Sequence, residues 1–91
     1  MSVDVRLPTI LRPLAGGQAQ VQANGATVGE VFEDLMKQFP GLGDRLITDD
    51  GALHRFVNVY LNDDDVRYLD KLDTKVGDAD VISILPAVAG G

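Results

Sequence analysis

Hydrophobic and polar residues alternate in the first part of the chain. Val3, Val5 and Leu7 are each separated by one polar residue, and the run QAQVQA from Gln18 repeats the pattern. A two-residue period is typical of a β-strand that buries one face. The first third therefore predicts two strands, joined by a flexible loop around the run AGGQ.

The next segment has the pattern of an amphipathic helix. Its first residues, TVGE, form a capping box, in which the Thr27 hydroxyl accepts one free helix N–H and Glu30 reaches back to another. Pro40 and Gly41 predict the end of this helix. Apolar residues between these signals recur with helical spacing, and we expect them to be core: Val28, Val31, Phe32, Leu35, Met36 and Phe39.

The second half predicts further strands. The run RFVNVYLN is rich in β-prone residues, with Phe56, Asn58 and Tyr60 on one face and aliphatic residues on the other. The run NDDD predicts a turn. A last strand is predicted from Val81 to Leu85, with apolar groups on both faces, as expected for a central strand.

The order of these elements predicts an α+β domain. One main helix has to cover one face of a sheet of four to five strands, and the other face is left to solvent. We expect Phe56 and Tyr60 on that open face, where they would form a docking surface for a partner. The domain is predicted to span residues 1–85, and residues 86–91 to form a flexible tail.

Composition and charge narrow the possible functions. The 91 residues are enough for one domain, and no apolar run approaches the roughly 20 residues of a membrane span, so we expect a cytoplasmic protein. The net charge of −6 argues against nucleic-acid binding. It favours a partner with a basic surface, although acidity can also serve solubility alone.

Candidate catalytic and metal-binding residues are few. The chain has no cysteine and one histidine, His54, which has no second histidine to complete a metal site. Residues 63–65 are all aspartate, but they lack the alternating spacing of a calcium loop and predict a solvated turn. We therefore expect no catalytic residue, no metal and no bound cofactor, and the protein is predicted not to be an enzyme.

The run PAVAGG at the end of the sequence suggests a chemical role for a tail. Pro86 is expected to end the last strand, and residues 87–89 form a short apolar stem. Gly90 and Gly91 have no Cβ and could pass through a narrow channel in a partner. A carboxylate is a poor electrophile, so it would need activation as an acyl-adenylate before a sulfur donor or an amine attacked it. The alternative is a frayed terminus.

Four segments together are similar to those of a known family: TVGE, RFVNVYLNDDDVR, TKVGDADVISILP and the final VAGG. The chain resembles the ThiS/MoaD sulfur carriers over nearly its whole length. The resemblance implies a ubiquitin-like β-grasp fold with a mixed sheet. It also implies that Gly91 is adenylated by an E1-like enzyme and converted to a thiocarboxylate, while Pro86, Ala87, Val88, Ala89 and Gly90 enter the partner.

Within that family, LPTILRP and LHRFVNVYLND resemble the carriers of cysteine biosynthesis most closely. This resemblance implies a pyridoxal-phosphate-dependent cysteine synthase and a zinc metallopeptidase as further partners, with ATP, pyridoxal phosphate and zinc held only by the partner enzymes. The small subunit of molybdopterin synthase, a thiamine sulfur carrier and a ubiquitin-like protein modifier remain alternatives. We expect a monomer, because such a carrier visits successive enzymes.

Overall fold

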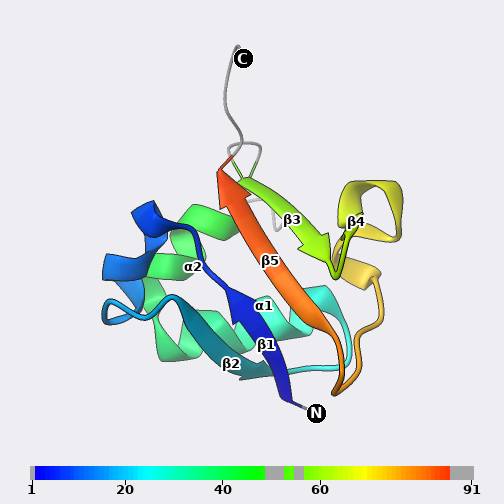
Figure 1. The fold of residues 1–91 in the computed structure, drawn as a ribbon, viewed down its shortest axis with the longest axis horizontal. Helices are drawn as coiled ribbons and strands as arrows, with labels where there is room; N and C mark the ends of the chain where they lie inside the picture. Colours follow the sequence, from blue (N-terminus) through cyan, green and yellow to red (C-terminus); the bar gives the residue numbers. More distant parts are fainter. Residues whose placement is uncertain (1, 49–52, 55–56, 87–91) are drawn as a thin grey trace.

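The computed structural model describes residues 2–48, 53–54 and 57–86 of the chain. Its centre is a five-stranded sheet in the order β2-β1-β5-β3-β4, curled around the helix α1 (Figure 1). β1 and β5 run parallel, and the other neighbouring strands run antiparallel. The strands are β1 (Ser2–Arg6), β2 (Gln20–Asn24), β3 (Val57–Leu61), β4 (Asp64–Asp65) and β5 (Val81–Pro86).

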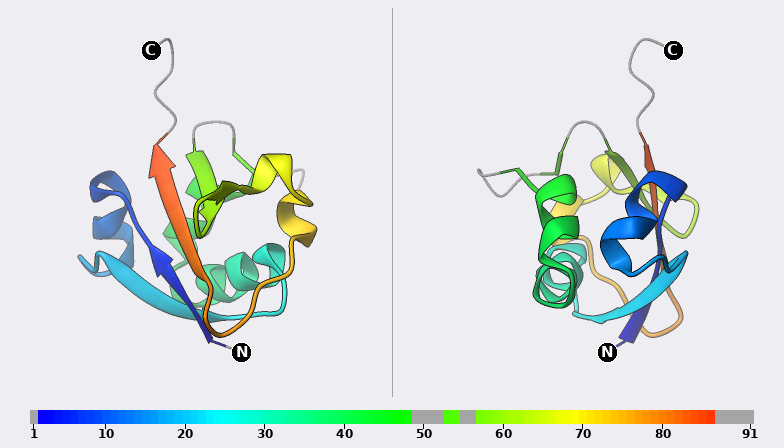
Figure 2. Two further views of the ribbon diagram at one scale, coloured as in Figure 1. Left: turned by 45° about the vertical axis from the view of Figure 1, so that its right-hand side comes forward. Right: turned by 90° about the vertical axis from the view of Figure 1, so that its left-hand side faces the viewer.

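Helical segments connect and cover these strands. The α-helices are α1 (Val28–Gln38) and α2 (Pro40–Leu46), and the 3₁₀ helices are η1 (Thr9–Ala15), η2 (Val66–Tyr68) and η3 (Lys71–Asp73). Both α-helices of the described residues, α1 and α2, lie together on one face of the sheet, and neither lies on the opposite face (Figure 2). The predicted α+β architecture, a β-grasp with a mixed sheet and one main helix on one face, is confirmed.

The buried core lies between α1 and the sheet. Val3 and Val5 of β1 and Ile82 and Ile84 of the central strand β5 are buried, as their alternation with less buried neighbours predicts. Four residues of the α1 stripe join them: Val28, Val31, Phe32 and Leu35. The predicted stripe is wrong at Met36, which is 38% exposed, whereas Phe39 is partly buried and packs against the core.

The start of α1 follows the predicted capping box with one difference. Thr27 Oγ1 accepts a hydrogen bond from the Glu30 amide at 3.2 Å, as the motif requires. Glu30 Oε1 accepts from the amide of Ala26, also at 3.2 Å, one residue before the usual partner. Two amides at the helix start are thus paired by local side chains.

Of the helical segments that the sequence pattern does not predict, α2 and η1 are the two longest. Pro40 ends α1 as expected, but it is also the first residue of α2, where the N–H that proline lacks would have no helical partner. α2 buries Leu42 and Leu46, which explains why this short helix is stable. Between β1 and β2 the sequence pattern predicts only a loop, but η1 lies there, buries Leu11 and ends at Gly16 in the left-handed conformation. Gly16 and Gly17 of the run AGGQ lie in the turn that follows η1.

None of the helices in the described ranges is long and apolar enough to cross a membrane.

Candidate functional site

The uncovered face of the sheet carries side chains from three strands. In the register of the sheet, Ser83 of β5 lies between Arg6 of β1 and Tyr60 of β3, and Leu85 lies next to Asn58. Cross-strand neighbours point to the same side of a sheet, so these five side chains share the face opposite the buried Ile82 and Ile84. This face is the surface that the sequence pattern predicts to be open.

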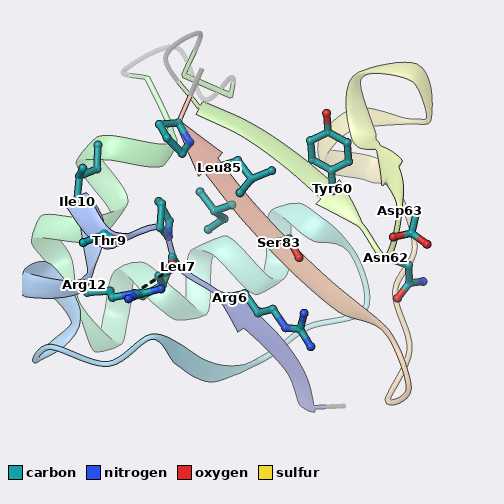
Figure 3. A pocket seen from close by; sticks show the side chains of 13 residues that line it. Arg6, Leu7, Thr9, Ile10, Arg12, Tyr60, Asn62, Asp63, Ser83 and Leu85 are labelled. Atoms are coloured by element: carbon teal, nitrogen blue, oxygen red, sulfur yellow. Dashed lines mark hydrogen bonds between the residues drawn. The ribbon is translucent and has the colours of Figure 1, made fainter. Parts of the chain in front are cut away.

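A shallow groove of about 650 Å³ crosses this face (Figure 3). It runs between η1 on one side and the β3–β4 turn on the other, and its floor is β5. Its apolar lining includes Ile10, which is 69% exposed, and Leu85, which is 47% exposed. Because these two exposed apolar side chains line one groove, we take the groove as the candidate docking surface.

The groove is also lined by basic side chains. Arg6 and Arg12 line it, with Asp63 as the acidic residue among its lining. The Arg12 Nε donates a hydrogen bond to the Leu7 carbonyl at 3.2 Å, which holds that guanidinium beside the residue that follows β1. In a chain of net charge −6, two arginines beside exposed apolar groups favour a partner surface that is both apolar and acidic.

The groove touches the point where the predicted tail begins. Pro86 is the last residue of β5, is exposed and lines the groove together with Leu85. Its register partner across the sheet is Val57, the first residue of β3. A partner in the groove would therefore contact the base of the tail, although residues 87–91, including Gly90 and Gly91, lie outside the described residues.

The start of β3 is held in place by one side chain. Arg67 of η2 donates through Nη2 to the carbonyls of Val57 at 2.8 Å and His54 at 3.1 Å, and through Nη1 to Asn58 Oδ1 at 2.7 Å. Hydrogen bonds from a guanidinium are stronger than those between neutral groups. Arg67 therefore holds the start of the strand whose first residue, Val57, pairs with Pro86.

The predicted site residues have different outcomes. Tyr60 is half-buried on the uncovered face and lines the groove, while Phe56 lies outside the described residues, so the docking role of both stays a prediction. Of the tail residues, only Pro86 is described, and it belongs to β5. Ala87, Val88 and Ala89 lie outside the described residues with the two glycines.

Several groove residues are not found by the sequence pattern. Ile10 and Arg12 lie in a segment that the pattern predicts to be a loop, and only the helical turn of η1 brings them to the groove. Arg6 and Leu85 could have been placed on the open face by alternation with their buried neighbours. The order of the strands was needed to bring these two together, because they are far apart in the sequence.

The acidic run after β3 has a structural role. Asp65 Oδ1 accepts from the Arg67 amide at 2.9 Å and caps η2, while Asp63 and Asp64 are exposed. Within the described ranges, no group of three or more His, Asp or Glu side chains is arranged to hold a metal ion.

Known proteins were found that are similar to this chain in sequence and in fold. The model of the ThiS family matches residues 5–91. The sulfur carrier protein CysO of Mycobacterium tuberculosis is 52% identical over 93 residues, which cover 100% of both chains. A chain in the crystal structure of the Amycolatopsis orientalis BexX/CysO complex is 49% identical with a TM-score of 0.89, covering 98% of this chain and 99% of that one. Small archaeal modifier protein 3 of Haloferax volcanii is 44% identical over 66 residues, 72% of this chain and 71% of that protein.

Proposed function

The chain belongs to the ThiS family, and from this premise we propose that it is a sulfur carrier protein of the CysO type, a substrate of partner enzymes. The observation that carries the proposal is the groove at the end of β5, because it places an apolar and basic docking surface beside Pro86. The partner binds this surface, and the five residues that follow Pro86 reach into its active site. An extended chain of that length spans at most about 18 Å, enough to enter a buried site.

The reaction at Gly91 begins with activation. The Gly91 carboxylate attacks the α-phosphorus of ATP in an E1-like enzyme, which gives an acyl-adenylate and releases pyrophosphate. A sulfur donor at the oxidation level of sulfide then attacks the acyl carbon and displaces AMP, which leaves a thiocarboxylate. Both steps use groups of the tail and the partner, in agreement with a chain that supplies no cysteine nucleophile.

The molecule that accepts the sulfur depends on the biosynthetic pathway in which the carrier acts. We propose cysteine biosynthesis, because a relative that is 52% identical over both full chains is a CysO protein. A pyridoxal-phosphate-dependent cysteine synthase would join the thiocarboxylate sulfur to the β-carbon of an activated serine and displace its leaving group, which gives a cysteine adduct on Gly91. A zinc metallopeptidase would then hydrolyse the bond between Gly91 and this cysteine, which releases cysteine and regenerates the Gly91 carboxylate. ATP, pyridoxal phosphate and zinc belong to these enzymes, which we place with the carrier in the cytoplasm.

The deciding experiment is intact-protein mass spectrometry. The protein is incubated with ATP, magnesium, sulfide and the E1-like enzyme from the same source, and the C-terminal peptide is then fragmented. We expect a mass gain of one sulfur minus one oxygen, localised to Gly91. An unchanged mass, with the enzyme shown to be active on its own known carrier, would contradict the proposal.

A second function has one observation in its favour. The match to small archaeal modifier protein 3 supports a ubiquitin-like modifier, in which a lysine amine of a target protein attacks the activated Gly91. The two functions leave different products in cells. A Gly-Gly remnant on target lysines indicates the modifier, whereas a free thiocarboxylate indicates the carrier.

A further inference from the structure

The strand β2 forms one edge of the sheet, because β1 is its single neighbour in the strand order. The Leu7 amide donates to the Ala19 carbonyl at 2.8 Å, so alternate residues of this antiparallel pair bond to β1. By the same alternation, the backbone groups of Gln20, Gln22 and Asn24 point away from the sheet. An edge of this kind is a template on which another strand can pair.

Two side chains of α1 occupy this edge. The Asn24 amide donates to Asp34 Oδ2 at 2.9 Å, and Gln38 Nε2 donates to the Gln22 carbonyl at 3.0 Å. Gln38 Nε2 also donates to Asp34 Oδ2 at 3.0 Å, which joins the two side chains one helical turn apart. An outward donor and an outward acceptor of β2 are thus already paired, as they would be by a neighbouring strand.

The opposite edge is closed in another way. β4 consists of Asp64 and Asp65 alone, and a strand this short and acidic offers little to pair with. β2 differs, because its sequence QVQAN has five residues and carries no charge. Two copies of β2 could therefore lie side by side without like-charge repulsion, in spite of the net charge of −6 on each chain.

We propose that Asp34 and Gln38 keep the β2 edge closed to a second copy of this chain, and that without them two copies pair antiparallel through β2. The pairing would join two sheets into one across a two-fold axis. The inference goes beyond the carrier function and does not depend on the chemistry of Gly91. Its consequence for that function is that the closed edges leave the groove face for partners.

The test is the oligomeric state of Asp34→Ala/Gln38→Ala, measured by sedimentation equilibrium over a series of concentrations. Alanine keeps α1 helical, so we expect a folded protein by circular dichroism. The dimer association constant is expected to rise at least about tenfold over wild type. Glu33→Ala is the matched control, because it removes one exposed carboxylate from α1, and it is expected to behave as wild type.

A proline variant shows whether any dimer uses β2. The Gln22 amide points away from β1, so Gln22→Pro leaves the existing sheet paired and removes an outward donor. Added to the double variant, it is expected to restore the monomer. A double variant that stays monomeric, or a dimer that persists with Gln22→Pro, would overturn the proposal.

Hydrogen exchange tests the hydrogen bond itself. At a concentration where Asp34→Ala is monomeric, the Asn24 amide is expected to exchange at least about tenfold faster than in wild type. An unchanged rate would mean that Asp34 does not hold this amide, and the proposed device would be wrong.

Discussion

Removing the exposed apolar side chains of the groove is the most direct test of how the carrier docks. The double variant Ile10→Ala/Leu85→Ala leaves the arginines and the tail unchanged. Ile10 is 69% exposed and Leu85 is 47% exposed in the free protein, and that exposed area is what a partner can bury. Full burial of such a side chain stabilises by about 1.5–3 kcal/mol.

Scaling by the exposed fractions gives the size of the effect. Ile10 can contribute about 1–2 kcal/mol to docking and Leu85 about 0.7–1.4 kcal/mol. Alanine keeps the Cβ of each side chain, so the expected loss is about 1.5–3 kcal/mol, or roughly 10- to 150-fold in kcat/KM. Because the groove is remote from the reacting carboxylate, the loss is expected to appear in KM with kcat unchanged.

The assay is the initial rate of thiocarboxylate formation, followed by intact mass against carrier concentration with the E1-like enzyme, ATP and sulfide. Tyr68→Ala is the matched control, because Tyr68 is 88% exposed but belongs to η2 and does not line the groove. Melting temperatures establish that both variants are folded. A groove variant with wild-type KM beside a Tyr68 variant with raised KM would refute the assignment of the docking face.

Two further substitutions separate the tail from the core. Gly90→Leu is expected to slow activation by roughly tenfold or more with the melting temperature unchanged, because a side chain would misplace Gly91 in a narrow channel of the partner. Gly41→Leu, in the exposed part of α2, is the control, and normal activation of the Gly90 variant would contradict the channel. Gly43→Ala is expected to destabilise the fold by about 1–3 kcal/mol in urea unfolding, because its Cβ would lie 2.1 Å from Met36 Cγ. The added change Met36→Ala is expected to recover most of that loss, and no recovery would mean that the two helices do not meet at this pair.

Sequence reasoning predicts those strands and helices well whose pattern of residues is contained within the element itself. The alternation in β1 and β5 and the capping residues Thr27 and Glu30 depend on neighbours a few positions away. η1 and α2 carry no such signal, because short helices are marginal alone and are stabilised here by burying Leu11, Leu42 and Leu46. Pro40 shows the ambiguity directly, since it ends one helix and begins the next.

In the candidate site, too, features of a single strand could be predicted, whereas features that depend on the packing of several elements could not. Tyr60 could be placed on the open face from the alternation of β3 alone, without any knowledge of the other strands. The groove could not be predicted in that way, because Ile10, Tyr60 and Leu85 come from segments that only the strand order brings together. Arg6 and Arg12 line the groove, but the chain as a whole has a net charge of −6. The net charge therefore could not predict the basic residues beside Pro86.

The position of β5 in the sheet links the groove to the C-terminal residues. β5 pairs with β1 along Asp4–Arg6 and with β3 along Val57–Leu61, so the strand that leads to the tail is held on both sides. The same strand forms the floor of the groove, and the two are therefore fixed relative to each other. In the proposed function, a partner that binds the groove therefore contacts the strand end at Pro86, and the Gly91 carboxylate that we propose to react follows five residues later in the sequence. If the proposed function is right, docking and chemistry are separable, and we expect substitutions in the groove to change KM and substitutions at Gly90 to change kcat.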